Sequence, residues 1–438
     1  MRVPDLGAGG LQVAGRRRTV QLTLLALALL AAMFCRSAIG PLQEAVRAAL
    51  RFSDNQMAVL QGMAMALPMA LGSIPLGLLA DRISRARMLV CFVALTPVSL
   101  GLSAVSSNFV LLFAARCIAG LSSAAVLIVS FSIVGDLYGP AQRGRASMIL
   151  ASGEIIGAPL SFALGGTLLV MVGITPGMRI AGPGLDDWRW SLVWMGGLLI
   201  PIALLMTLLI DPPRSEIVVK RPSLRVVWPE LWSYRAVALP MLLARGMVWL
   251  ADGSVFVWAA PSFSRRFHLP PDQIGALMGT VLLVSGLVGP ALGGPLADFC
   301  QRRGDPRRTM VVLAGIALLS MPMALFNLMP NPMSAGIMMT MFLTLGFSIA
   351  TAGVTLSIIV IPGELRGLYL GIAFTVGSVF FVGLAPLAVS GLSGMLGGEA
   401  MIGKALTIVC ASASSLGATV FALSARFFPT SEQPLARP

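Results

Sequence analysis

The sequence predicts an all-α membrane protein in which twelve transmembrane helices form two pseudo-symmetric six-helix bundles. Three observations lead to this prediction. Hydrophobic residues make up 57% of the 438 residues and charged residues only 11%, which excludes a soluble globular or a disordered chain. The apolar residues form twelve runs, each long enough to cross a bilayer core about 30 Å thick as a helix. The two halves of the chain also share a sequence pattern, which is typical of transporters built from parallel repeats.

The shared pattern has one constant offset. Each half ends an apolar stretch with an aspartate followed by several arginines, at 72–87 and again at 289–308. Three pairs of identical residues are separated by the same 217 positions, which we call the repeat offset: Gln56 and Gln273, Gly62 and Gly279, and Asp81 and Asp298. One offset at three landmarks indicates that two homologous halves were joined.

The predicted spans follow the apolar runs in order. The first six lie at 19–43, 54–80, 87–106, 108–135, 145–173 and 190–210, and the last six at 235–260, 272–299, 309–329, 332–361, 365–390 and 399–427. No small-residue cleavage pattern follows the first run, so we expect an uncleaved first helix. The polar, proline-rich segment 211–234 is the expected linker between a 19–210 bundle and a 235–427 bundle.

The basic residues predict the orientation. With the N-terminus inside, 21 of the 31 lysines and arginines face the cytoplasm, 7 lie in outside loops and 3 lie within spans. This bias places the tails 1–18 and 428–438 and the linker in the cytoplasm. We expect an integral protein of a bacterial cytoplasmic (inner) membrane.

Several classes of protein are disfavoured by composition. The net charge of +13 is distributed between apolar segments, which suits a membrane surface better than nucleic acid. The five cysteines are scattered and His268 is the only histidine, so neither a metal site nor a catalytic centre is indicated. No Gly-Lys-Ser or Gly-Lys-Thr occurs, which argues against ATP-driven transport. We expect a monomer without a cofactor, and not an enzyme.

Four motifs resemble those of the major facilitator superfamily. Residues 77–87 (GLLADRISRAR) resemble its loop between helices 2 and 3, and 293–308 resembles a weaker second copy. Arg116 and Gly120 resemble its Arg-x-x-x-Gly motif in helix 4, and 153–166 resembles the glycine–proline pattern of helix 5. The resemblance implies a secondary transporter that works by alternating access.

Within that superfamily, residues 39–43, 52–56 and 74–85 are similar to the Spinster-like branch. That branch implies lipid-like substrates, such as lysophospholipids and sphingolipids, and proton coupling. Two acids of the branch are missing, because Cys35 precedes Arg36 where the branch has an aspartate, and 120–124 (GLSSA) contains no glutamate. The branch's coupling mechanism therefore does not transfer directly.

The resemblance also implies a cytoplasmic latch. The family places its loop aspartate beside helix 11, where a helix N-terminus stabilises a carboxylate, and an arginine of the loop near an acid at the end of helix 4. The latch and gating residues expected here are Gly77, Asp81, Arg82, Arg85, Asp136, Asp298, Gly157 and Pro159. A positive-inside anchor without a latch is the alternative for the loop.

Five charged residues lie within the predicted spans, namely Arg36, Arg116, Glu154, Arg245 and Asp252. Ionisable groups at membrane depth are costly and suggest function. We expect the arginines to bind substrate, with buried ion pairs as the alternative. The repeat offset also relates Cys35 to Asp252, so the acid missing from the first helix reappears in the seventh. Asp252, with Glu154 second, is the expected proton-coupling group. A structural ion pair with Arg36 or Arg245 is the alternative for Asp252, and a role in packing or gating is the alternative for Glu154.

The predicted substrate is a small organic or amphiphilic molecule with an anionic or zwitterionic head, because the spans hold three arginines against two acids. Protons and the lipid bilayer are the other expected partners. Efflux of drug-like organic cations is one alternative. A transport-inactive receptor or sensor is another, since the coupling acids of the branch are absent.

Overall fold

The structure is a computed structural model that describes residues 8–179, 185–212, 224–301 and 306–426. Over these ranges the chain forms helices and turns without a strand. Twelve helical segments of the described chain are long and apolar enough to cross a membrane, which confirms the predicted fold class. The outer parts of the predicted tails (1–7 and 427–438) and most of the linker (213–223) lie outside the described residues.

The first half of the chain contains eight α-helices: α1 (Ala8–Ser37), α2 (Gln43–Leu50), α3 (Asp54–Gln61), α4 (Met63–Arg82), α5 (Arg85–Val105), α6 (Phe109–Leu137), α7 (Pro140–Ile174) and α8 (Asp187–Leu205). The second half follows the linker helix α9 (Leu224–Ser233) and contains α10 (Arg235–Phe267), α11 (Pro271–Gln301), α12 (Pro306–Met323), α13 (Pro332–Val360), α14 (Gly363–Val376), the π-helical segment η4 (Gly377–Gly383), α15 (Ala385–Met395) and α16 (Ile402–Ser424).

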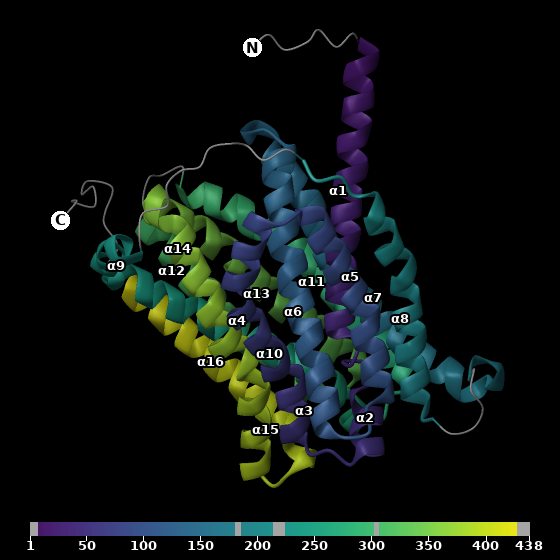
Figure 1. The fold of residues 1–438 in the computed structure, drawn as a ribbon. Helices are drawn as coiled ribbons and strands as arrows, with labels where there is room; N and C mark the ends of the chain where they lie inside the picture. The colour runs from purple at the N-terminus through teal and green to yellow at the C-terminus, as the bar shows by residue number, and fades with distance from the viewer. Residues whose placement is uncertain (1–7, 180–184, 213–223, 302–305, 427–438) are drawn as a thin grey trace.

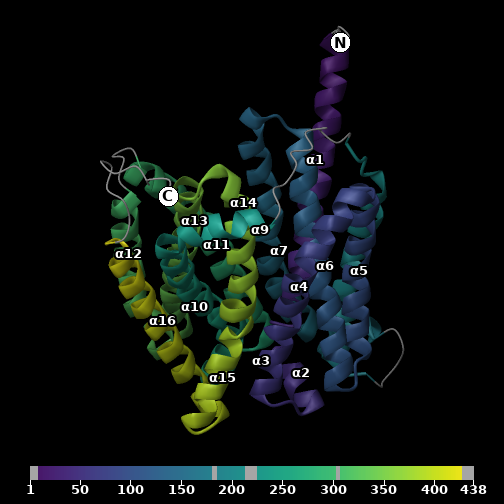
Figure 2. The same ribbon diagram turned by 60° about the vertical axis from the view of Figure 1, so that its left-hand side comes forward.

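The two halves lie side by side with their helices roughly aligned (Figures 1 and 2). The start of α1, the linker helix α9 and the end of α16 lie toward one end of the bundle, which we call the termini end. Helices α2, α3 and α15 lie at the opposite end, which we call the far end. The largest contact between the halves is between α7 and α11.

Two predicted spans are interrupted. The predicted first span, 19–43, includes the end of α1 at Ser37, a turn and the first residue of α2. The second span breaks at Gly62, between α3 and α4. A Cβ at Gly62 would overlap the carbonyl oxygen of Gly383, so the break occurs where the second helix of one half touches η4 of the other. Small residues permit such close approach of helices in lipid.

The repeated Gln56 has a structural role at the start of α3. Its backbone N–H donates to Ser53 Oγ at 3.3 Å, and its side-chain oxygen accepts from the Ser53 N–H at 2.9 Å. This reciprocal capping box satisfies two N–H groups that a helix start would otherwise leave unpaired. The helix α3 therefore begins at a position that the sequence itself defines.

The segment 211–234, which the sequence predicts to be a partly amphipathic linker on the membrane surface, contains the helix α9. In α9 the rings of Trp228 and Trp232 stack with centroids 6.2 Å apart, and both side chains are about half exposed, at 51% and 49%. Leu231, between them in sequence, is buried in the core of the second half. The helix is therefore amphipathic, and it packs on α10 and α14.

Candidate functional site

A cavity of about 230 Å³ lies between the two halves. Four lining residues come from the first half, and they are Met33, Arg36, Gln61 and Arg116. The second half contributes Trp249, Asp252, Gly253, Phe256, Val257, Leu282, Leu343, Phe347, Ala350 and Val382. Most of the wall is apolar, and its charged groups are two arginines from one half and one aspartate from the other.

Helix α10 supplies the longest stretch of this wall. Its lining residues recur at positions 249, 252, 253, 256 and 257, which is the spacing of one helical face. A helix shows that face over about two turns, so the same surface presents two aromatic rings and the carboxylate of Asp252.

Arg116 is largely committed to the backbone of α1. Its guanidinium donates to the carbonyl oxygen of Arg36 at 2.7 Å and to that of Cys35 at 3.5 Å. The helix α1 ends at Ser37, so these carbonyls belong to its last turn, where intrahelical donors run out. Arg116 therefore caps α1 and fixes the backbone that carries Arg36, and its own Nε is buried without a hydrogen-bond partner.

Asp252 faces Arg36 across the interface between the halves, since both line the same cavity. The described ion pairs include none between them. The Oδ1 atom of Asp252 is buried without a hydrogen-bond partner. It is packed against Gly346 of α13, where a Cβ would come within 2.5 Å of that oxygen. The sequence therefore identified Arg36 and Asp252, and the described ion pairs do not join them.

Cys35, one repeat offset before Asp252, has a different environment. Its sulfur lies 3.1 Å from Ser99 Oγ on α5, and Cys35 is not among the lining residues. The position that matches the cavity wall is the next one, because Arg36 and Gly253 both line the cavity and are also separated by the repeat offset. The repeat offset thus relates Asp252 to Cys35, which lies one position before the cavity-lining residue Arg36.

Arg245, expected as a substrate contact, does not line the cavity. It is 5% exposed, donates to Ser357 Oγ on α13 at 3.4 Å, and lies over the ring of Trp249 at 5.0 Å from the centroid. It also makes no described ion pair with Asp252, although both lie on α10, two turns apart. The reason is local, since the Arg245 stem packs on Gly353 of α13 and turns away from the cavity.

Glu154 also lies outside the cavity wall. It is partly buried on α7 and interacts electrostatically with Arg36, without an ion pair within 4.0 Å among those described. Its neighbour Gly157 packs against α1, where a Cβ would come within 2.6 Å of the Leu30 carbonyl oxygen. The carbonyl of Pro159 in turn faces Gly279 of α11, 3.0 Å from where its Cβ would be. The expected gating residues of α7 therefore lie at contacts with α1 and with the other half.

The loop between α4 and α5 is anchored by Arg85. The structure brings Arg85 into an ion pair with Asp136 at the end of α6, and a second one, at 3.1 Å, with Asp211 of the linker. The same arginine donates to the carbonyl oxygen of Pro212 at 3.0 Å. The sequence predicts that an arginine of this loop lies near Asp136, and the structure shows that this arginine is Arg85, whereas its contact with Asp211 was not predicted.

The other residues of the loop motif lie at the surface. Asp81 and Arg82 are exposed at the end of α4, and Asp298 is exposed near the end of α11. A Cβ at Gly77 would meet no described atom within 4 Å. The second-copy arginines Arg302 and Arg303 lie outside the described residues.

An ion-pair cluster at the far end was not predicted. Arg265 of α10 binds Asp54 at 2.7 Å and Glu44 at 2.8 Å, and Arg47 of α2 binds Glu399 at 2.6 Å. Asp54, Glu44 and Arg47 belong to the first half, whereas Arg265 and Glu399 belong to the second. We call these five residues the far-end cluster, and they join the two halves. The sequence signal was limited to Arg47 and Arg265, which the topology prediction counts as basic residues of outside loops.

Metal binding has no support in the described part of the chain, where no group of three His, Cys, Asp or Glu side chains could hold a metal ion.

A family model described as Major Facilitator Superfamily matches residues 25–386. The chain belongs to the major facilitator superfamily. Protein spinster homolog 3 of Danio rerio is 26% identical over 267 residues, which is 55% of this chain and 49% of that protein. A probable sugar efflux transporter of Helicobacter pylori (strain G27) is 29% identical over 227 residues, 52% of this chain and 53% of that protein. The chain thus matches about half the length of these curated relatives.

A solved structure shares the fold over nearly the whole chain. It is a bacterial homologue of the human lysosomal transporter Spinster, described as inward-facing and unoccupied, and it aligns with a TM-score of 0.76 at 18% identity. The alignment covers 94% of this chain and 97% of that one. The comparisons confirm the predicted superfamily and the likeness to Spinster proteins, and the chain is an integral membrane protein of the major facilitator superfamily.

Proposed function

We propose that this transporter moves an amphiphile with an anionic or zwitterionic head group by alternating access, coupled to protons through Asp252. The observation that carries the proposal is the cavity, in which Arg36 and Arg116 of one half face an unpaired carboxyl group of the other. The guanidinium fork suits carboxylate and phosphate groups. The apolar remainder of the wall suits an alkyl or aryl part of the same molecule.

The size of the cavity limits what it encloses. Its volume of about 230 Å³ is below the roughly 300–1,000 Å³ typical of sites that enclose drug-sized ligands. The cavity therefore accommodates a head group and the atoms next to it, and a long apolar chain would extend beyond it.

Proton coupling follows from the position of Asp252. A carboxyl group binds a proton more readily in a dry site without a countercharge than beside an arginine. Movement of the second half against the first would change the distance from Asp252 to Arg36, and with it the proton affinity. An anionic substrate competes with the carboxylate for the same arginine, which would link the two movements. Glu154, which interacts with Arg36 from outside the wall, is the second candidate.

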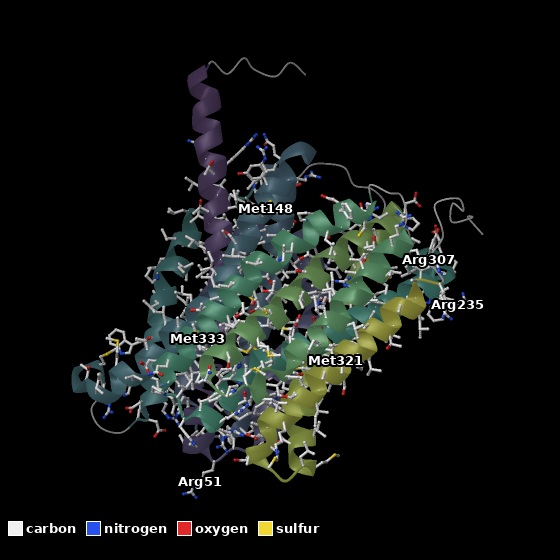
Figure 3. The ribbon with its side chains drawn as sticks, turned by 180° about the vertical axis from the view of Figure 1, so that it is seen from behind. Arg51, Met148, Arg235, Arg307, Met321 and Met333 are labelled. Carbon is white, nitrogen blue, oxygen red and sulfur yellow. The ribbon has the colours of Figure 1, made fainter. Side chains whose placement is uncertain are left out.

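For orientation, we infer that the termini end is cytoplasmic, in a bacterial inner membrane, and that this conformation is inward-facing. Exposed Arg235 and Arg307 project at the termini end, whereas Arg51 projects at the far end (Figure 3). The excess of basic residues on the termini side supports a cytoplasmic location. The far-end cluster closes the opposite side, and the fold resembles the inward-facing Spinster homologue.

The experiment is transport by the purified protein in proteoliposomes, with and without an imposed pH gradient. Oleoyl-lysophosphatidylglycerol serves as an anionic probe and tetraphenylphosphonium as a lipophilic cation. We expect uptake of the lysolipid that the gradient stimulates, and a loss of at least tenfold in Arg36→Ala. Lysolipid transport that is unchanged in Arg36→Ala would refute the assignment of the head-group site.

A second candidate is export of lipophilic cations. The unpaired carboxyl of Asp252 lies in a wall that also contains Trp249, Phe256 and Phe347, and aromatic faces attract cations. Preferential transport of tetraphenylphosphonium, undiminished in Arg36→Ala and Arg116→Ala, would favour this candidate over the first.

A further inference from the structure

Trp249 of α10 contacts both the cavity and the π-helical segment η4, which lies between α14 and α15. Its indole lines the cavity. The same ring lies against Gly377, the first residue of η4, so closely that a Cβ there would overlap atoms Cζ3 and Cε3. One turn earlier on α10, Gly246 is covered by the ring of Phe381 in the same way. At the contact between α10 and η4, an aromatic ring of each element therefore packs on a glycine of the other.

Arg245 holds the other side of this arrangement. Its guanidinium lies 5.0 Å from the centroid of the Trp249 ring, a distance typical of a cation–π contact. The arginine is itself fixed, because its stem fills the space left by Gly353 and one of its N–H groups donates to Ser357. Arg245 is buried and not part of the cavity wall, and of its described contact partners Gly353, Ser357 and Trp249 only Trp249 lines the cavity.

We propose that Arg245 and Gly377 are positioning residues that together fix the Trp249 indole as part of the cavity wall, and so determine which substrates fit. This proposal rests on the proposed transport function. It assigns the third intramembrane arginine a role in shaping the cavity, without contact with the substrate. The indole is held by a cation and by a glycine, and the space still open to it is the cavity. A side chain added at Gly377 would therefore move the ring toward the substrate.

A double-mutant cycle tests the proposal, since coupling between two residues appears as non-additivity. Binding of radiolabelled oleoyl-lysophosphatidylglycerol to the protein in nanodiscs is measured for Arg245→Gln, Gly377→Ala and Trp249→Leu, and for each of the first two combined with the third. We expect Arg245→Gln and Gly377→Ala each to weaken binding about five- to tenfold. In the Trp249→Leu background the same substitutions should change binding less than twofold. Equal losses in both backgrounds would overturn the proposal and would indicate direct contact or a general structural defect.

A second measurement does not depend on the substrate. Ala350→Cys places a thiol in the cavity wall of a cysteine-free variant, and its rate of reaction with a small methanethiosulfonate reagent reports local access. We expect Gly377→Ala to change this rate at least fivefold, and Trp249→Leu to reverse the change. An unchanged rate in Gly377→Ala would overturn the positioning role. If the parent protein binds no lysolipid, the proposed substrate class fails while this rate still decides the role of the indole.

Discussion

The two ends of the molecule differ in how closely the repeated glycines pack against neighbouring atoms. Gly62 and Gly279 are related by the repeat offset, and both are tightly packed against the opposite half. Gly77 and Gly294 are related by the same offset, yet a Cβ at either would meet no described atom within 4 Å. Within each pair the two glycines have the same packing. The first pair is closely packed, whereas the second pair has open space among the described atoms.

Under the proposed alternating access, this difference predicts which contacts are present in this conformation and which form in the other one. In the far half, backbone contacts at glycines and the far-end cluster hold the halves together. Toward the termini end, a Cβ at Gly77 or Gly294 would meet no atom of the described residues within 4 Å. A transporter that alternates between two states needs both sets of small residues, because each set is used when its own end is closed.

The largest expected effect is from breaking the far-end cluster. Arg265→Glu would place an acid opposite Asp54 and Glu44. Removing one partner of a largely buried pair costs about 3–5 kcal/mol, which is more than a hundredfold in the equilibrium between states. We expect the far end to open, so that a cysteine introduced by Phe256→Cys in the cavity becomes reactive to a membrane-impermeant maleimide from that side.

The control is the next residue. Arg266→Glu changes the charge by the same amount, but Arg266 donates only to the Met329 carbonyl oxygen among its described hydrogen bonds. The exchange Arg265→Asp with Asp54→Arg should restore part of the closure. Equal maleimide reactivity in Arg265→Glu and Arg266→Glu would contradict a specific closing role for the cluster.

A second effect, next in size, concerns the cavity between the two ends. Asp252→Asn cannot take up a proton on its side chain, so we expect at least a tenfold loss of pH-gradient-driven accumulation of the lysolipid probe, with exchange without a gradient preserved. Glu154→Gln, outside the cavity wall, should lose less. Full gradient-driven accumulation in both variants would exclude coupling through these acids.

The third prediction concerns the loop at the termini end. Asp81→Asn should slow transport severalfold to tenfold while leaving membrane insertion and probe binding intact, because the expected latch acts on the equilibrium between states. The matched control is Asp298→Asn in the second repeat, for which we expect a smaller effect. Transport at the parental rate in Asp81→Asn would show that the loop is an anchor only.

The smallest expected effect compares two glycines directly. In Gly62→Ala the added methyl group would overlap the Gly383 carbonyl oxygen, and overpacking of this kind lowers the free energy of unfolding by about 1–3 kcal/mol. We therefore expect a lower thermal unfolding temperature for this variant. Gly77→Ala should leave the thermal unfolding temperature unchanged, since its Cβ meets open space, but should slow transport if the termini end closes during the cycle. Equal unfolding temperatures in both variants would contradict the packing difference between the ends.

Much of this fold could be predicted, because hydropathy and the repeat offset are properties of the sequence itself. The helix breaks were less accessible. The sequence shows that Gly62 is repeated. It does not show that Gly62 contacts η4, because that contact depends on how two helices distant in sequence cross. The amphipathic character of the linker could be predicted, but the bounds of α9 could not, because its packing on α10 and α14 is a tertiary contact.

The site was predicted in part for a similar reason. A charge inside an apolar span is conspicuous, so Arg36, Arg116 and Asp252 could be selected. The direction in which a side chain points cannot be read from the sequence. Arg245 points toward Gly353 and Ser357 and therefore not into the cavity. The far-end cluster was missed because its charges lie near helix ends, where a sequence shows only how many there are and not which ones meet.

The length of α7 has a mechanical consequence. With 35 residues the helix is about 52 Å long, well beyond a hydrocarbon core of about 30 Å. It meets α11 where Phe162 touches Gly275, and the exposed Arg145 lies about 25 Å away along the same helix. A rotation of about 10° at that contact would carry Arg145 through roughly 4 Å. We therefore expect a spectroscopic label near the termini end of α7 to convert a small rotation at this contact into a measurable displacement.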